Sequence, residues 1–424
     1  MLIGTHLGEN MHNTQVQEFA QAVASKATII VVDPRYSVAA SKAKYWLPVK
    51  AGADMALVLA WMNVLVAEGL YDKEFVARHG HGFDKFAAAI KESTPEWAEA
   101  ETGIAAATIR ATAREMAMAR PAALVHPGRR VNWYGDDAQR GRATALLNAL
   151  LGNWGRKGGL FVQNGMDVAG IGFPKYPEAK RPKVDNPDHK WPFADEEVTT
   201  GLREATLTGK PYPIKGWVVY ASNLIQTLPN EKETIEAIDK LDLLVVVDTH
   251  PAEITGYADV VLPDTTFLER HDDLYVAWGR QGWTALRQPV VAPPGEQKPA
   301  WWMAKELANR LGVGEYMPFK DMEEYLARRC EKSGIDYAKL RKEGILMGPK
   351  APSTIEEGAE IAFDTPSGKV EFFSEQLAKA GFDPVPKYTA PEAAPDSLPP
   401  FTLRSHISWA RARRSSTRAT RSTR

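Results

Sequence analysis

Apolar and polar positions follow helix and strand patterns in a regular order along this chain. Near the N-terminus, residues 13–25 have helical spacing, and the expected strand at residues 28–32 contains the continuous apolar run of residues 29–32. The same order returns at residues 231–240 and 243–247. Continuous apolar runs of this length are typical of parallel strands that are covered on both faces. The pattern therefore predicts an α/β protein built around parallel sheets.

Other segments extend this prediction. Helices are expected at residues 55–68, 108–117, 137–151 and 300–311, a short helix at Pro95-Glu96, and strands at residues 122–126 and 217–221. Asp54 is placed to cap the helix that follows it. Seven prolines between residues 165 and 215 interrupt any regular pattern, so a long surface excursion is expected there.

Two of the apolar runs belong to a repeated unit. Ile29–Val32 ends in Asp33 and Leu244–Val247 ends in Asp248, and in both cases a Leu-Pro pair has its proline 15 positions after the aspartate. Open parallel sheets bind ligands at the carboxyl ends of their strands. We therefore predict two related doubly wound parallel-sheet domains, at residues 1–150 and 151–385, followed by a linker and tail at residues 386–424.

Composition narrows the class of protein. The chain is 44% hydrophobic and 25% charged, as in ordinary globular proteins. Its single cysteine, Cys330, excludes an internal disulfide and any four-cysteine zinc or iron–sulfur site made by this chain alone. Cys330 lies in a predicted helix and is interpreted as a structural thiol. We see no signal peptide, and the longest apolar helix candidate, residues 55–67, is too short to span a bilayer.

The C-terminal tail has a different composition. Residues 404–424 contain seven arginines and no acidic residue, so removing them changes the formal net charge from −1 to −8. A basic arm of this kind can bind nucleic acid. The alternative is a disordered or frame-shifted end, which we favour because the tail begins abruptly after the strand-like Phe401-Thr402-Leu403.

The repeated aspartates suit a nucleotide. A carboxylate at a strand end can accept two parallel N–H bonds, and the ring N–H and amino group of guanine form such a donor pair. The loop that begins at Gly4 precedes a helix, whose N-terminus favours a diphosphate. Gly4 and Gly8 do not match the G-x-G-x-x-G fingerprint of nicotinamide sites. An aspartate after a strand is also a common turn former, so the pattern alone does not decide between a nucleotide site and a structural turn.

Arginines and histidines provide further candidates. The adjacent Arg129 and Arg130 follow a predicted strand, where they are either an anion clamp or two surface charges. Five histidines lie in predicted loops near strand ends without metal-ligand spacing, so no metal site made by protein ligands is expected: His6, His12, His126, His250 and His271.

An ordered series of motifs resembles one family. This chain resembles the catalytic subunits of the DMSO reductase family of molybdopterin enzymes, and within that family it is most similar to the polysulfide and thiosulfate reductase branch. The motifs that carry the resemblance are Gly4–His12, Val32–Arg35, Leu47–Asp54, Val125–Gly128, Tyr220–Asn223, Val247–Thr249, Ala258–Pro263 and Thr365–Lys369. The series covers residues 1 to about 385.

The resemblance implies a molybdenum bis(molybdopterin guanine dinucleotide) cofactor, with one arm bound by each domain. It implies that the first arm is held by Gly4, Thr5, His6, Gly8, Glu9, Asn10, His12, Asp33, Arg35, Ser37, Gly52 and Asp54. The second arm is then held by Ser222, Asn223, Val247, Asp248 and Arg270. Gly128 lies near the pterins, and Arg129 or Arg130 faces the anionic substrate as a candidate catalytic residue.

The resemblance also implies a reaction and partners. The expected reaction is reduction of polysulfide, thiosulfate or a related oxyanion, in which molybdenum passes two electrons, the S–S bond breaks and an arginine stabilises the anion. The expected partners are an iron–sulfur electron-transfer subunit and a membrane anchor subunit, with neither nucleic acid nor direct membrane insertion. Intact members of the family are often exported, which implies a periplasmic location.

The chain departs from the family in several places. The four-cysteine segment for a 4Fe–4S cluster and the residue that ligates molybdenum are not in this sequence, and the family's last domain is replaced by the arginine-rich tail. Near Pro299, where the family often has an acidic residue, the chain has Lys298 and Ala300. We therefore expect a fragment without turnover by itself. A non-catalytic scaffold of the same fold in a respiratory electron-transfer complex is the alternative.

Overall fold

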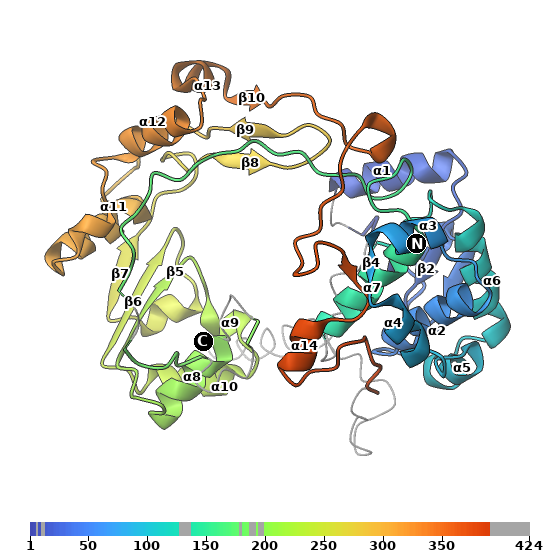
Figure 1. The fold of residues 1–424 in the computed structure, drawn as a ribbon. Helices are drawn as coiled ribbons and strands as arrows, with labels where there is room; N and C mark the ends of the chain where they lie inside the picture. The colour runs from blue at the N-terminus through green and yellow to red at the C-terminus, as the bar shows by residue number, and fades with distance from the viewer. Residues whose placement is uncertain are drawn as a thin grey trace, which may run out of the picture. The chain divides into compact units, whose positions relative to one another are not determined.

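The computed structural model describes residues 1–5, 7–9, 13–126, 137–177, 180–185, 192–193 and 199–390 (Figure 1). The chain divides into two compact units, Met1–Leu160 with Ala362–Arg424, and Phe161–Ile361. Residues 362–385, which the sequence prediction included in the second domain, thus belong with the first unit. Each unit contains a parallel sheet with helices, as the predicted α/β class requires.

The first unit has a parallel sheet at its N-terminal end. Strands β1 (Leu2–Ile3), β2 (Ile30–Val32) and β3 (Tyr45–Leu47) lie in that order, and α1 (Asn13–Ala24) connects β1 with β2. Leu2 pairs with Val31 in β2 and forms a parallel bridge with His126. The strand predicted at residues 122–126 is therefore wrong in extent, because the described chain there makes only this single bridge.

Helices pack beside this sheet around one central helix. Eleven of the fourteen residues of α2 (Asp54–Ala67) are buried, because α5 (Pro95–Thr102), α6 (Ala106–Met118) and α7 (Asp137–Leu150) all pack on it. Trp61 is fully buried and its Nε1 donates to Thr112 Oγ1 at 2.8 Å, which satisfies the indole N–H. Asp54 was expected to cap α2, but it is the first helical residue, after an N-cap at Ala53 that makes no side-chain hydrogen bond.

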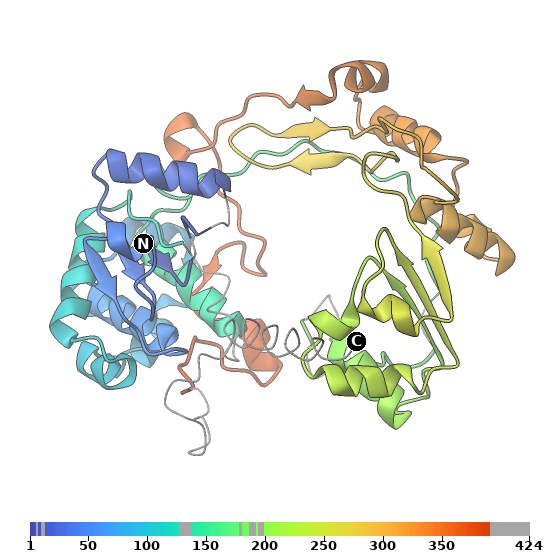
Figure 2. The same ribbon diagram turned by 180° about the vertical axis from the view of Figure 1, so that it is seen from behind.

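The segment from Ala362 is attached to the first unit by strand pairing and by hydrogen bonds from a partly buried arginine. Strand β11 (Val370–Glu371) pairs in parallel with β4 (Gly80–His81), between α3 (Lys73–His79) and α4 (Phe83–Ala89), and α14 (Glu375–Lys379) follows it. The Arg142 guanidinium on α7 donates to the carbonyl oxygens of Pro384 at 3.0 Å and Glu371 at 3.4 Å. Figure 2 shows the same unit from behind.

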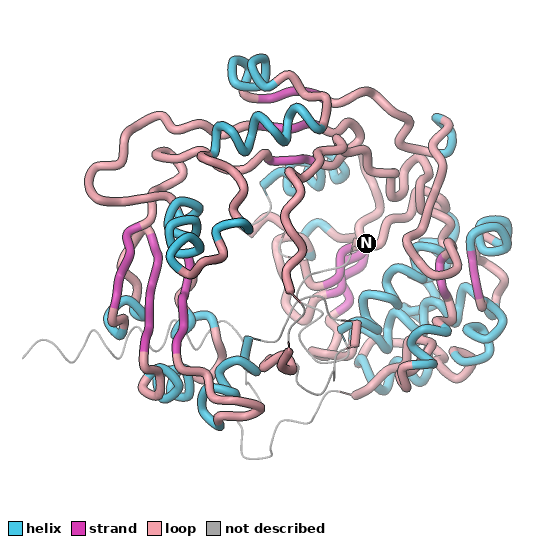
Figure 3. The backbone as a smooth tube through the Cα atoms, turned by 60° about the vertical axis from the view of Figure 1, so that its left-hand side comes forward, coloured by secondary structure: helices cyan, strands magenta, loops and turns pink. Residues whose placement is uncertain are grey.

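The second unit has its own parallel sheet, in the order β5 (Gly216–Tyr220), β6 (Leu243–Asp248) and β7 (Val260–Pro263) (Figure 3). Trp217, Val219, Leu244 and Val246 form a core with α8 (Thr199–Thr208), α9 (Leu224–Thr227) and α10 (Glu231–Ile238). The prediction of no regular structure at residues 165–215 is wrong at α8. This helix contains no proline, and it buries Ala205 and Thr206.

The rest of the second unit surrounds a small antiparallel sheet, β8 (Tyr275–Ala277), β9 (Trp283–Ala285) and β10 (Ile345–Met347). Helices α11 (Ala300–Arg310), α12 (Met322–Lys332) and α13 (Tyr337–Glu343) accompany it. Cys330 is fully buried beside Leu326 and Leu340, and burial raises the pKa of its thiol, as expected for a structural residue. Short 3-10 helices lie at Ala40–Lys42, Glu253–Tyr257, Gly314–Tyr316 and Ile355–Glu357. Among the described helices, none has the length and apolar character needed to cross a membrane.

Candidate functional site

Asp33 is fixed at the carboxyl end of the first sheet. Its Oδ1 accepts the Arg35 N–H at 2.9 Å, and its own N–H donates to the Leu47 carbonyl at 3.2 Å. Trp46 Nε1 donates to the Asp33 carbonyl at 2.9 Å. The residue is only 7% exposed, so its carboxylate is held in one orientation in a poorly solvated place. The sequence predicted this position because the apolar run stops there.

Three more predicted residues lie on the loops beside Asp33. Glu9, after β1, pairs with the Arg35 guanidinium, and its Oε1 accepts the Val38 N–H at 2.9 Å. Ser37 is buried and its Oγ accepts the Ala40 N–H at 3.2 Å. Gly8 has a φ of +90°, and a Cβ there would lie 2.8 Å from Val38 Cγ1. The two loops therefore pack tightly because residue 8 is glycine.

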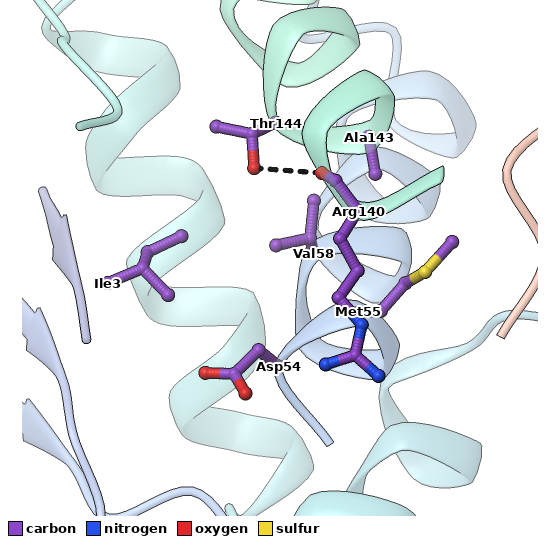
Figure 4. Close-up of a pocket in the computed structure, with 7 residues that line it drawn as sticks. All are labelled: Ile3, Asp54, Met55, Val58, Arg140, Ala143 and Thr144. Carbon is purple, nitrogen blue, oxygen red and sulfur yellow. Dashed lines mark hydrogen bonds between the residues drawn. The ribbon is translucent and has the colours of Figure 1, made fainter. Parts of the chain in front are cut away.

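Asp54 is the second buried carboxylate of the first unit. Burial raises the pKa of this carboxyl to about 6, the Arg140 charge opposes the shift, and Asp33 adds to it. Asp54 and Arg140 line a cavity of about 10 Å³ between α2 and α7, which is room for about one water molecule. Figure 4 shows both residues among the side chains that line this cavity, with the Asp54 carboxylate directed away from the Arg140 guanidinium. The sequence missed Arg140, because one arginine in a helical pattern gives no signal of burial.

The raised pKa predicts how stability responds to an Asp54→Asn substitution. An aspartate with a pKa near 6 instead of its usual 3.8 favours folding fully below pH 3.8, and this contribution is lost as pH rises through 6. The Asn variant is therefore expected to be more stable than the wild type by about 3 kcal/mol at pH 8. Urea unfolding should show this gap shrinking as pH falls toward 4. A gap that does not depend on pH would contradict the cause given for the shift.

Asp248 occupies the corresponding place in the second sheet. Its Oδ1 accepts the Thr249 N–H at 2.7 Å and the His250 N–H at 3.4 Å. The second bond corresponds to the bond from the Arg35 N–H to Asp33 Oδ1. After β5, Asn223 Nδ2 donates to Glu253 Oε2 at 2.6 Å. The Asn223 Oδ1 is buried and has no hydrogen-bond partner among the described residues. A buried acceptor of this kind is suited to a donor group of a ligand.

Arg270 is held at the same sheet edge by two carboxylates. Its Nη1 donates to Asp264 Oδ2 at 2.8 Å and to the Thr265 carbonyl at 2.6 Å, and its Nε donates to Asp272 Oδ1 at 3.0 Å. Burial lowers the pKa of Arg270, but the carboxylates of Asp272 and Asp264 outweigh that effect and raise it. The guanidinium therefore carries a fixed positive charge.

Asp264 is a residue that the sequence reasoning missed. It is 4% exposed and directly follows β7, and its Oδ1 accepts the N–H groups of Thr265 at 2.7 Å and Ala300 at 3.1 Å. Burial and the charge of Asp264 raise the pKa of Tyr220, whose phenol bonds to this carboxylate. The only available signal was an acidic residue immediately after Leu262-Pro263.

The structure thus brings the described candidates to the carboxyl edges of the two parallel sheets. The Gly4 N–H bonds to the Val32 carbonyl at 2.9 Å, the next residue, Thr5, is buried, and Gly52 lies two residues before α2. In the second unit, the Ala221 N–H next to Ser222 bonds to the Val247 carbonyl at 2.9 Å. His6, Asn10, His12, Gly128, Arg129 and Arg130 lie outside the described residues. Within the described ranges, no cluster of three or more His, Cys, Asp or Glu side chains could hold a metal ion.

Comparison with known proteins identifies the family to which a chain with these two parallel sheets belongs. The sequence matches the molybdopterin oxidoreductase family over residues 1–310, and the chain belongs to that family. The chain is 33% identical over 414 residues to the thiosulfate reductase molybdopterin-containing subunit PhsA of Salmonella typhimurium, a match that covers 88% of this chain and 54% of that protein. It is 30% identical to the dimethyl sulfoxide reductase DmsA of Escherichia coli, over 86% of this chain and 51% of that protein.

A solved structure supports the same fold. Acetylene hydratase from Pelobacter acetylenicus superposes with a TM-score of 0.76 at 27% sequence identity, over 92% of this chain and 57% of that chain. The chain therefore spans just over half the length of the relatives that it matches. The predicted family and fold class are confirmed, whereas the roles of single residues stay predictions.

Proposed function

We propose that each parallel sheet holds one guanosine diphosphate arm of a molybdenum bis(molybdopterin guanine dinucleotide) cofactor. The observation that carries this proposal is the repeated geometry of Asp33 and Asp248. Both lie at the carboxyl end of the middle strand of a parallel sheet, and the Oδ1 of each accepts the backbone N–H of the second residue after it. Family membership supports a molybdenum–pterin cofactor, and the hydrogen-bonding chemistry of the two aspartates supports the proposal of guanosine arms.

The residues present fit such a group. In the first unit, Asp33 and Asp54 are buried carboxylates, and burial raises the pKa of Asp54 despite a backbone hydrogen bond and the Arg140 charge. The N–H groups of a guanine edge supply donors and relieve that penalty. In the second unit, Arg270 offers a fixed positive charge for a diphosphate, and Asn223 Oδ1 offers a buried acceptor.

The proposed reaction is reductive cleavage of an S–S bond. When bound, the cofactor supplies transfer of two electrons. Thiosulfate takes up two electrons and one proton, its S–S bond breaks, and sulfite and hydrogen sulfide ion are released. Arg129 or Arg130 is proposed to bind the substrate anion. The most informative support is the 33% identity with a thiosulfate reductase subunit, and reduction of polysulfide is chemically equivalent.

The same comparison supports a proposal about partners. The matched thiosulfate reductase protein is named as a subunit. We propose that this chain likewise works with an iron–sulfur subunit that delivers electrons and a membrane anchor subunit, in the periplasm. The single cysteine cannot provide a four-cysteine cluster, so this chain alone is proposed to lack turnover.

Cofactor content tests the binding proposal. The chain is produced in a host that makes the molybdenum cofactor and in a matched strain that cannot make molybdopterin, and both preparations are denatured. Pterin fluorescence and guanine nucleotide are expected only from the first preparation. A chain that is empty in both hosts contradicts the proposal and favours the scaffold. The reaction is tested separately. The complex is purified from its native cells, and oxidation of a reduced dye is measured with thiosulfate, polysulfide or dimethyl sulfoxide as the substrate. Activity with dimethyl sulfoxide but with neither thiosulfate nor polysulfide contradicts the proposed reaction.

A further inference from the structure

His271 lies in the loop between β7 and β8, beside helix α12 of the second unit. Its side chain is 16% exposed, and its Nδ1 is buried without a hydrogen-bond partner among the described residues. Its Nε2 lies 3.8 Å from Glu323 Oε1 in the first turn of α12, which is too far for a hydrogen bond. The imidazole is therefore enclosed by the fold but is not fixed there by hydrogen bonds of its own.

Four charged side chains face this imidazole. Glu323 Oε1 also lies 3.3 Å from Arg341 Nη2 in the last turn of α13, which packs on α12 (Figure 1). Asp321 is the N-cap of α12, and Asp272 is the next residue of the loop. Burial lowers the pKa of His271 below its usual value, Glu323 opposes this shift, and Arg341 adds to it. The two aspartates have smaller effects that raise the pKa.

Protonation makes this position unfavourable for His271. A charged imidazole carries an N–H donor at both nitrogens, so Nδ1 becomes a buried donor that has given up its hydrogen bond to water. Because the pKa is lowered in the folded chain, a form in which the ring reaches water takes up the proton first as pH falls below 6.5. Acid therefore favours a conformation in which the imidazole has left its place beside α12.

The residues on either side of His271 connect it to the second candidate site. Arg270 precedes it and carries the guanidinium that Asp264 holds at the sheet edge. Asp273 attaches the loop to α12, because its Oδ2 accepts the Tyr325 hydroxyl at 3.1 Å. A displacement of residue 271 from α12 therefore moves the backbone that carries Arg270.

We propose that His271 is a pH-sensitive contact between residues 270–273 and α12, and that its protonation releases these residues from the helix. At neutral pH the uncharged imidazole stays beside Glu323, and Arg270 keeps its place at the sheet edge. In acid the charged imidazole turns toward water, and the guanidinium loses its fixed position. The consequence for a cofactor rests on the function proposed above, whereas the release itself does not.

Histidine NMR of the full chain tests the contact. The imidazole Cε1–H resonance of His271 is assigned by its loss in His271→Gln, and its titration midpoint is expected below 6.5. Glu323→Gln is expected to lower this midpoint further and Arg341→Gln to raise it, because the two charges act on the imidazole in opposite directions. A wild-type midpoint at or above 6.5, or shifts of the same sign in the two variants, overturns the proposal.

Hydrogen exchange followed by mass spectrometry tests the release. Peptides that cover residues 264–274 are compared at pH 7.5 and pH 5, with exchange times adjusted for the intrinsic rate. Their protection is expected to fall several-fold in acid in the wild type and in the control His81→Gln, which replaces an exposed histidine of the first unit. In His271→Gln, whose side chain stays uncharged, protection is expected to be the same at both pH values. Unchanged protection in the wild type, or an equal loss in His271→Gln, overturns the proposal.

These measurements use the chain without cofactor, so their outcome does not depend on the proposed function. The effect on the cofactor is measured separately, as guanine nucleotide retained by the loaded chain at pH 5, where His271→Gln is expected to retain more than the wild type. A wild-type chain without nucleotide at pH 7.5 contradicts the proposed function. Equal retention by the two proteins at pH 5 contradicts only the control of the site by His271.

Discussion

Replacing Asp33 by asparagine is expected to weaken binding of one guanosine arm of the cofactor while leaving the first unit folded. The asparagine Oδ1 can still accept the Arg35 N–H that now bonds to Asp33 at 2.9 Å, so the local turn is kept. The amide, however, is neutral, and its NH2 group opposes the amino group of guanine. Two charge-assisted bonds of about 1.5–3 kcal/mol each are weakened or lost. Affinity for the arm is then expected to fall by about 100-fold or more.

This loss is measured as guanine nucleotide retained by the cofactor-loaded chain after gel filtration. Asp84→Asn is the matched control, because Asp84 is an exposed carboxylate at the start of α4 in the same unit. The control is expected to retain the wild-type amount. Equal retention by the Asp33 and Asp84 variants would show that Asp33 does not bind the nucleotide.

Replacing Asp264 by asparagine is expected to destabilise the second unit and release Arg270. Asp264 is nearly fully buried and its Oδ2 carries the ion pair with Arg270 Nη1 at 2.8 Å. Removing one partner of a buried pair costs about 3–5 kcal/mol, and we expect about 3 kcal/mol because Arg270 keeps its bond to Asp272. The second guanosine arm is expected to be lost as well, since the positive charge is no longer held in place.

Urea unfolding followed by tryptophan fluorescence measures the first effect. Asp272→Asn is the control, because Asp272 also pairs with Arg270 but its side chain is 23% exposed. Its free energy of unfolding is expected to change by less than half as much. If the two variants are equally stable, the fixed position of Arg270 does not depend on Asp264.

The sequence predicted those parts of the fold that local patterns determine. The apolar runs before Asp33 and Asp248 are the middle strands of the two sheets, and the regular helix of residues 137–151 is α7. The pairing of β4 with β11 was not predictable, because it joins residues far apart in the sequence through strands of two residues each. Helix α8 was missed because prolines on both sides of it favoured an irregular segment.

The candidate sites were predictable where a residue ends a strand, and less so where burial decides its chemistry. Asp33 and Asp248 were found from position alone. Arg140 was missed because its importance comes from its charge near the buried Asp54. Asp264 was missed because its importance comes from its ion pair with Arg270. The cap predicted for Asp54 failed because α2 begins at that residue, which buries the carboxylate.

The number of guanine nucleotides per chain tests the central claim most directly. The cofactor-loaded chain is denatured and hydrolysed, and the released guanine nucleotide is divided by the protein concentration. We predict two nucleotides per wild-type chain. Because both arms belong to one cofactor, Asp33→Asn and Asp248→Asn are each expected to lower the amount of cofactor that is retained, and the double variant is expected to retain none. One nucleotide or none in the wild type, or unchanged retention after substitution of either aspartate, would contradict the claim that each sheet holds one arm.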